Sequence, residues 1–125
     1  MPLQPGLSAR LELTVKEADT AVALGSGDVP VLGTPRLVAL CEEACCKAIE
    51  GQLDDAETTV GMRVQLDHLA PTGVGLTVTT EVTLEKVEGR RLTFTATASD
   101  PHGLVGAGKL TRVIVERESF LKKSL

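Results

Sequence analysis

Only one stretch of this chain has the apolar periodicity of a long helix, and that stretch cannot bury its own apolar side. Within "TPRLVALCEEACCKAIEG", from Pro35 to about Gly51, small and aliphatic side chains recur at helical spacing. The members of this apolar stripe are Leu37, Leu40, Cys41, Ala44, Cys45, Ala48 and Ile49. Thr34 can cap the helix, and Pro35 suits its first position, where a missing N–H costs nothing. A helix with such a stripe must lie against another layer of structure.

The other segments have the patterns of strands. "ARLELTVK" (9–16) alternates aliphatic with polar residues, and "TAVAL" (20–24) is short enough for a second strand. "GSGDVPVLG" (25–33) is rich in glycine and proline and predicts a loop. Four longer strand-like segments follow the helix, at residues 58–68, 75–87, 90–100 and 104–116.

Turn residues indicate how these four segments are connected. "VEGRRL" predicts a tight hairpin, with Glu88 and Gly89 at the turn, and "SDPHGL" predicts another. "LAPTGVG" is a longer connection, and the tail "ESFLKKSL" is expected to fray. We therefore predict an α+β fold for a single domain spanning residues 1–125: an antiparallel meander of four strands wrapped around one long central helix. This arrangement is the hotdog fold, and its outer sheet face would stay open or meet another subunit.

Composition excludes several functional classes. The formal net charge is −4, without a block of like charges, and the only aromatic residues are Phe94 and Phe120, which argues against nucleic-acid binding. All three cysteines lie in the predicted helix, so we expect no disulfide, a reducing compartment, and thiols that are core or near-core and not catalytic. His68 and His102 lack ligand spacing to them, so no metal site is expected. With no long apolar run and no signal-like N-terminus, we expect a cytoplasmic protein that does not enter membranes.

Glu42 is the unusual residue of the helix. It falls on the border of the apolar stripe, where a carboxylate would be partly buried. Burying a carboxylate is costly unless it is paired or protonated, and such costs are commonly tolerated at functional sites. The structural alternative is a side chain that reaches solvent from the edge of the stripe.

A second unusual pattern lies in "TVGMRVQLDHLAPTG". By strict alternation Val60, Met62, Val64, Leu66 and His68 share one strand face, which places the histidine at the end of an apolar face. A capping or core-edge histidine is the structural alternative. The glycine at position 61 lies on the other parity, where a glycine often marks the close approach of a ligand or another backbone.

These residues resemble a known family. "GTP" (33–35), "LCEEAC" (40–45), "VGMRVQLDHLAPTGVGLTVT" (60–79), "VEGRRLTF" (87–94) and "GAGKLTRVIV" (106–115) are similar to the corresponding segments of hotdog thioesterases of the fluoroacetyl-CoA thioesterase type. The resemblance covers nearly the whole chain. It implies an acyl-CoA thioesterase without a cofactor, which forms a homodimer, and further pairing into a tetramer stays open.

The resemblance also implies site residues. Thr34, Glu42 and His68 have the intervals of the family's catalytic set, and Gly61 and Arg112 stand where the family has a glycine near the thioester carbonyl and an arginine at the site. Which of the threonine hydroxyl, the carboxylate or a water attacks the thioester stays open at this point. In such dimers the site lies between subunits, so residues of one helix are expected to meet residues of the partner chain.

The CoA phosphates and the acyl group raise separate questions. Arg112 and the hairpin residues Arg90 and Arg91 are candidates for the phosphates, although solvated turn residues are the more common case for the latter two. Residues 25–33 contain no aromatic residue, whereas the fluoroacetyl-specific enzyme has phenylalanines there that cover a small acyl group.

Two other functions compete with hydrolysis. A hotdog module could bind an acyl-CoA or a related small ligand without turnover, and a hotdog dehydratase or hydratase could act on hydroxyacyl or enoyl thioesters. The spacing of the predicted Thr/Glu/His set favours the thioesterase.

Overall fold

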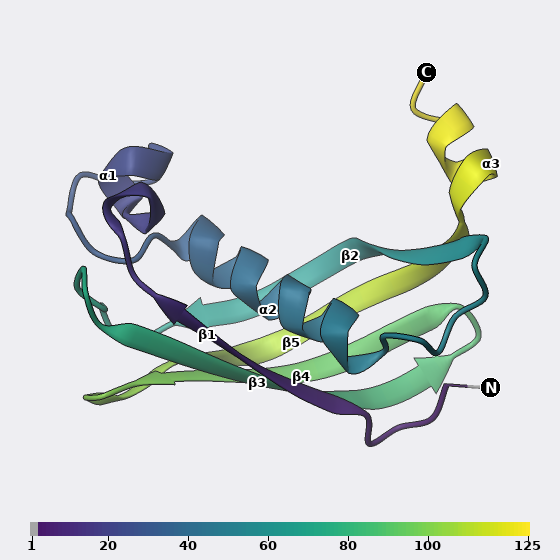
Figure 1. Ribbon diagram of the computed structural model, residues 1–125, viewed down its shortest axis with the longest axis horizontal. Helices are drawn as coiled ribbons and strands as arrows, with labels where there is room; N and C mark the ends of the chain where they lie inside the picture. Colours follow the sequence, from purple (N-terminus) through teal and green to yellow (C-terminus); the bar gives the residue numbers. More distant parts are fainter. Residues whose placement is uncertain (1–2) are drawn as a thin grey trace.

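The structure is a computed structural model that describes residues 3–125. Its strands in chain order are β1 (Ser8–Thr14), β2 (Glu57–His68), β3 (Thr77–Glu88), β4 (Arg91–Asp100) and β5 (Gly103–Glu116). Its helical segments are η1 (Glu17–Asp19), α1 (Ala21–Leu24), α2 (Thr34–Ala48) and α3 (Arg117–Lys122). These elements confirm the predicted α+β architecture, in which an antiparallel sheet curves around one main helix (Figure 1).

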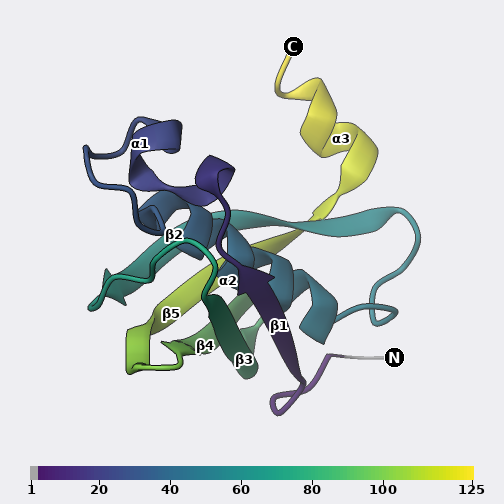
Figure 2. The ribbon, with the colours of Figure 1, turned by 60° about the vertical axis from the view of Figure 1, so that its left-hand side comes forward.

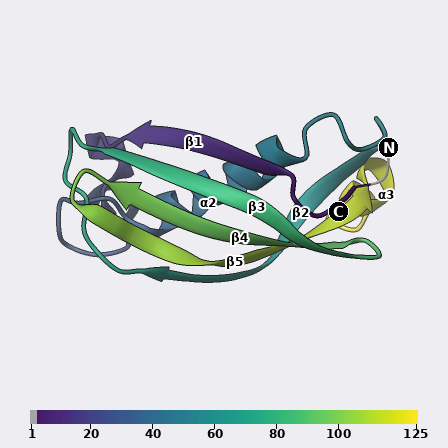
Figure 3. The same ribbon diagram turned by 90° about the horizontal axis from the view of Figure 1, so that it is seen from below.

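The sheet has the strand order β1-β3-β4-β5-β2, with every neighbouring pair antiparallel. The predicted hairpins β3–β4 and β4–β5 are confirmed, but the prediction of a four-stranded meander is wrong. β2 pairs with β5 at the far edge, because the long connection after β2 carries the chain across the end of the sheet before β3 begins. Figure 3 shows the succession β1, β3, β4 and β5 from the outer side of the sheet. β1 and β2 are therefore the two edge strands of the described sheet.

The stripe of α2 packs against the concave side of the sheet, mainly on β3 and β1 (Figure 1). All seven predicted stripe residues are buried, and they share one core with residues of the sheet such as Phe94 and Leu110. The helix begins one residue earlier than predicted, because Gly33 is its N-cap and Pro35 lies in its second position. The hydroxyl of Thr34 does not cap the helix and is used elsewhere.

Two short helices replace structure that was predicted otherwise. "TAVAL" forms the helical turn α1, because the Thr20 hydroxyl accepts a hydrogen bond from the Ala23 N–H and Gly25, with φ of 71°, ends the turn in the left-handed region. The tail does not fray at its start: Glu116 caps α3 by accepting hydrogen bonds from the N–H groups of Glu118 and Ser119. α3 projects away from the end of β5 (Figure 2).

Smaller details also differ from expectation. The β3–β4 turn consists of Gly89 and Arg90, since Glu88 already pairs with Arg91. Cys41 and Cys45 are buried as expected, but Cys46 is exposed, because it lies past the border of the stripe. Within residues 3–125, no helix combines the length and apolar composition that crossing a membrane requires.

The pairing of β2 with β5 depends on a glycine. Gly108 lies opposite Leu66, and a Cβ atom at this position would come within 2.7 Å of the Leu66 Cα atom, which is backbone and cannot move aside. We expect Gly108→Ala to lower the free energy of unfolding by roughly 1–3 kcal/mol, the usual cost of overpacking. Denaturant unfolding measures this. Gly73→Ala is the control, since a Cβ there meets nothing within 4 Å, and equal stability of the two variants would contradict the assigned register.

Candidate active site

The first polar group lies where α2 begins and β2 ends. Thr34, in the first turn of α2, is exposed, and its Oγ1 lies 2.8 Å from Nδ1 of His68, the last residue of β2. A hydroxyl within hydrogen-bond distance of an imidazole is the arrangement in which a base activates a nucleophile. The structure thus brings together two of the three residues of the predicted catalytic set.

The environment of His68 favours the uncharged form of its ring. Burial lowers the pKa of His68, and the nearby backbone carbonyl of Ala70 offsets only part of this effect. The second ring nitrogen, Nε2, is buried and has no hydrogen-bond partner within residues 3–125. A neutral ring protonated at Nε2 can accept the proton of the Thr34 hydroxyl at Nδ1.

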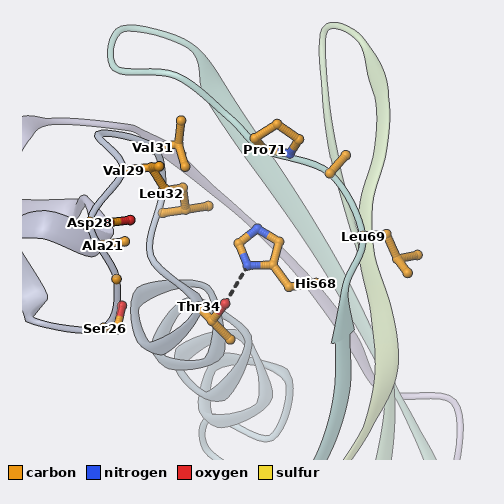
Figure 4. Close-up of a pocket in the computed structure, with 12 residues that line it drawn as sticks. Ala21, Ser26, Asp28, Val29, Val31, Leu32, Thr34, His68, Leu69 and Pro71 are labelled. Atoms are coloured by element: carbon orange, nitrogen blue, oxygen red, sulfur yellow. Dashed lines mark hydrogen bonds between the residues drawn. The ribbon is translucent and has the colours of Figure 1, made fainter.

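A cavity of about 350 Å³ adjoins this pair. One wall is formed by the loop before α2, which carries Val29, Val31 and Leu32, and the opposite wall by the segment after β2, which includes Pro71 (Figure 4). Backbone bonds hold the two walls together, since the Leu32 N–H donates to the Thr72 carbonyl over 2.8 Å. The two walls are therefore joined to each other beside the Thr34 hydroxyl.

The second polar group lies further along α2. Nη1 of Arg112 donates to Oε2 of Glu42 over 3.1 Å, and this ion pair joins β5 to the helix. The Glu42 side chain is 35% exposed, so the prediction that it is partly buried is confirmed. Glu42 is paired, and the alternative of a carboxylate that merely reaches solvent does not describe it.

Thr59, on β2, fixes the orientation of the guanidinium. Its Oγ1 accepts from Nε of Arg112 over 3.1 Å, and its carbonyl accepts from Nη2 over 3.0 Å. Arg112 is only 7% exposed and all three of its nitrogens are used within the protein, so the role in binding a CoA phosphate does not fit it. Sequence reasoning missed Thr59. The only signal was its position, two residues before the glycine at position 61 and on the same strand face.

Gly61 provides the space in which the Glu42 carboxylate lies. A Cβ at position 61 would come within 2.6 Å of Oε2 of Glu42 and 3.6 Å of Nη1 of Arg112. Every larger residue at this position would displace the ion pair. The mid-strand glycine is thus explained by the close approach of a side chain from the helix.

A β-bulge between Gly61 and Arg63 places this glycine on the same face as the histidine. Gly61 lies opposite Arg112 and Val64 opposite Leu110, and residues two apart on β5 share a face. The expectation from strict alternation was therefore wrong: position 61 faces the helix together with Val64 and Leu66, while Val60 lies on the other face. A bulge inserts one residue and resets the alternation, and it leaves no reliable mark in sequence.

The two polar groups are separate within one chain. Thr34 and Glu42 lie eight residues apart on α2, which corresponds to about 12 Å along the helix axis. No hydrogen bond or ion pair joins them: the partner of Thr34 is His68, and the partner of Glu42 is Arg112. One chain thus holds two separate polar groups, for which we use the names hydroxyl half-site (Thr34, His68) and carboxylate half-site (Glu42, Gly61, Arg112).

The other residues considered from the sequence, Arg90 and the cysteines, have surroundings that indicate structural roles. Arg90 pairs with Glu57 over 3.2 Å at the surface, as a turn residue would. Burial raises the pKa of Cys45 to about 12 and also raises that of Cys41, which makes both thiols poor nucleophiles. Among residues 3–125, no three His, Cys, Asp or Glu side chains are grouped so that they could hold a metal ion.

Comparison with known proteins gives one consistent relationship. Residues 15–118 match the model of the fluoroacetyl-CoA-specific thioesterase family. The chain is 37% identical over 93 residues to the fluoroacetyl-CoA thioesterase of Streptantibioticus cattleyicolor, a match that covers 74% of this chain and 67% of that protein.

Solved structures agree with this relationship. A structure of the fluoroacetyl-CoA thioesterase FlK has a TM-score of 0.93 and 30% identity and covers 99% of this chain and 96% of that one. A thioesterase superfamily member from Thermus thermophilus has a TM-score of 0.88 and 30% identity, over 98% and 93% of the two chains. The fold class and the resemblance in sequence are therefore confirmed, and the chain belongs to the fluoroacetyl-CoA-specific thioesterase family.

Proposed function

We propose that this protein is an acyl-CoA thioesterase, which hydrolyses a thioester of a small acyl group to the free acid and CoA. The observation that carries the proposal is the 2.8 Å contact between the Thr34 hydroxyl and the His68 imidazole beside a cavity. Two structures of one relative support the substrate class: FlK is a fluoroacetyl-CoA thioesterase, and a variant of FlK was solved in complex with acetyl-CoA.

Thioester hydrolysis needs a nucleophile, a base, a group that stabilises the oxyanion, and a proton for the leaving sulfur. In our proposal the Thr34 hydroxyl gives its proton to His68 and attacks the thioester carbonyl. His68 then protonates the departing CoA sulfur. Glu42 activates the water that hydrolyses the resulting ester of Thr34, which releases the acid and restores the hydroxyl. Arg112 and Thr59 act as positioning residues for the carboxylate, and Gly61 leaves the space in which that carboxylate lies.

This mechanism needs both half-sites at one thioester, and a homodimer supplies them. Within the described sheet the outer edge of β2 is unpaired over 12 residues, and Met62 and Val64 are each 41% exposed. A long free edge of this kind favours pairing with another strand. Antiparallel pairing of two β2 strands about Gln65, with the bulge taking up one residue, puts Gly61 of one protomer opposite His68 of the other. The carboxylate half-site of one chain then meets the hydroxyl half-site of its partner.

A binding module without turnover is the competing function. It predicts that acyl-CoA binds and that no free thiol appears, so a thiol-release assay with several acyl-CoAs separates the two. We also propose that the protein works in the cytoplasm, because its three cysteines form no disulfide and Cys46 is exposed.

Replacing Glu42 tests the chemical step. Glu42→Gln keeps an oxygen that can accept from Arg112 but removes the charge, so we expect kcat for thiol release to fall by roughly 10²-fold, the usual scale for a lost general base. Glu43→Gln is the matched control, because Glu43 is the adjacent, exposed carboxylate of the same helix. A folded Glu42→Gln protein with full activity would exclude the proposed mechanism.

The pH dependence tests the role of His68. Protonation of Nδ1 removes its ability to accept from Thr34, so activity should be lost as the pH falls through the pKa of His68. Because burial lowers that pKa, the acid limb of kcat/KM should be centred below the ordinary histidine value of about 6.5. His102→Gln, at the exposed β4–β5 turn, should leave the limb in place. A limb centred above 6.5, or one that persists in His68→Gln, would contradict the assignment.

A further inference from the structure

We propose that the cavity beside Thr34 accepts acyl groups larger than acetyl, and that Asp28 makes it select uncharged or positively charged acyl groups and exclude those that carry a carboxylate. The inference rests on the proposed thioesterase function and names the substrate class of the same site.

The proposed selection by charge rests on the charged residues of the cavity wall. Ser26 and Asp28 lie in the loop before α2, on the side of the cavity away from Pro71 (Figure 4). Among residues 3–125, the side chains that line the cavity include no lysine or arginine, and no ion pair engages Asp28. The cation closest in sequence, Arg36, pairs with Asp19 over 3.1 Å.

The other titratable group of the wall does not compensate for this charge. Burial lowers the pKa of His68, so its ring is neutral near pH 7. The cavity therefore carries one net negative charge. An acyl group that ends in a carboxylate would meet a like charge without a cation to pair with, whereas an ammonium group would be attracted.

The proposed preference for acyl groups larger than acetyl rests on the volume of the cavity and on its aliphatic lining. The cavity of about 350 Å³ far exceeds the space of a two-carbon acyl group, given that a water molecule takes about 30 Å³ of liquid volume. Ala21, Val29, Val31 and Leu32 provide aliphatic surface, and residues 25–33 contain no aromatic side chain that could fill the space. A short aliphatic chain, straight or branched, suits such a wall.

Two pairs of substrates with similar size and different charge test the inference. β-Alanyl-CoA and butyryl-CoA differ by an ammonium in place of a methyl group, and malonyl-CoA and isovaleryl-CoA differ by a carboxylate in place of a branched end. For the parent protein we expect kcat/KM to be higher for butyryl-CoA than for acetyl-CoA, and lower for malonyl-CoA than for isovaleryl-CoA.

Variants at position 28 separate charge from shape. In Asp28→Asn the ratio of kcat/KM for isovaleryl-CoA over malonyl-CoA, and that for β-alanyl-CoA over butyryl-CoA, should each fall by about fivefold, the scale of one partly exposed charge interaction. Asp28→Lys should shift both ratios further in the same direction. Asp55→Asn, at an exposed site outside the cavity, changes the net charge equally and should leave both ratios unchanged.

The outcomes distinguish this inference from the function on which it rests. Hydrolysis of butyryl-CoA with ratios that Asp28→Asn does not change, or that Asp55→Asn changes equally, would overturn the role of Asp28 and leave the thioesterase in place. Faster hydrolysis of acetyl-CoA than of every larger substrate would overturn the size argument. No thiol release from any substrate would overturn both proposals.

Discussion

The apolar stripe of α2 can be removed from water only by the concave side of the sheet, and the rest of the structure depends on this burial. The stripe packs on β3 and β1. The polar side of the helix, which carries Thr34 and Glu42, therefore lies beside β2 and β5. Thr34 thereby meets His68 at one end, and Glu42 meets Arg112 further along. The hydrophobic core thus positions both half-sites, although none of their side chains belongs to it.

The carboxylate half-site shows how local backbone geometry holds a carboxylate in a defined position. Arg112 is held from one side by two oxygens of Thr59, and its remaining nitrogen reaches Glu42. The carboxylate occupies the space above Gly61, which faces it only because a bulge resets the alternation of β2. A buried guanidinium with all its nitrogens paired is rigid, so the carboxylate is held in one place before any substrate arrives.

Sequence patterns predicted the parts of the fold that depend on periodicity. The stripe of α2 and the later strands follow from spacing alone, and the hairpins follow from glycine, proline and aspartate. Patterns failed where a single contact decides the structure. Thr20 turns an apparent strand into α1 through one capping bond, and the crossing of β2 to the far edge depends on a loop that has no pairing signal. The candidate site residues Glu42 and His68 stood out in the sequence as polar groups on or beside apolar faces. Thr59 was not, because a threonine in a strand is ordinary.

The central claim is that each active site combines the hydroxyl half-site of one chain with the carboxylate half-site of its partner. Mixing His68→Ala and Glu42→Gln proteins under conditions that exchange subunits tests it. Each mixed dimer would contain one site with both residues intact and one site that lacks both. We predict that thiol release from an acyl-CoA, which is low for each variant alone, rises on mixing toward a quarter of the parent rate, since half of the dimers are mixed and each has one working site. If confirmed subunit exchange brings no rise in activity, each chain uses only its own residues, and the account is contradicted.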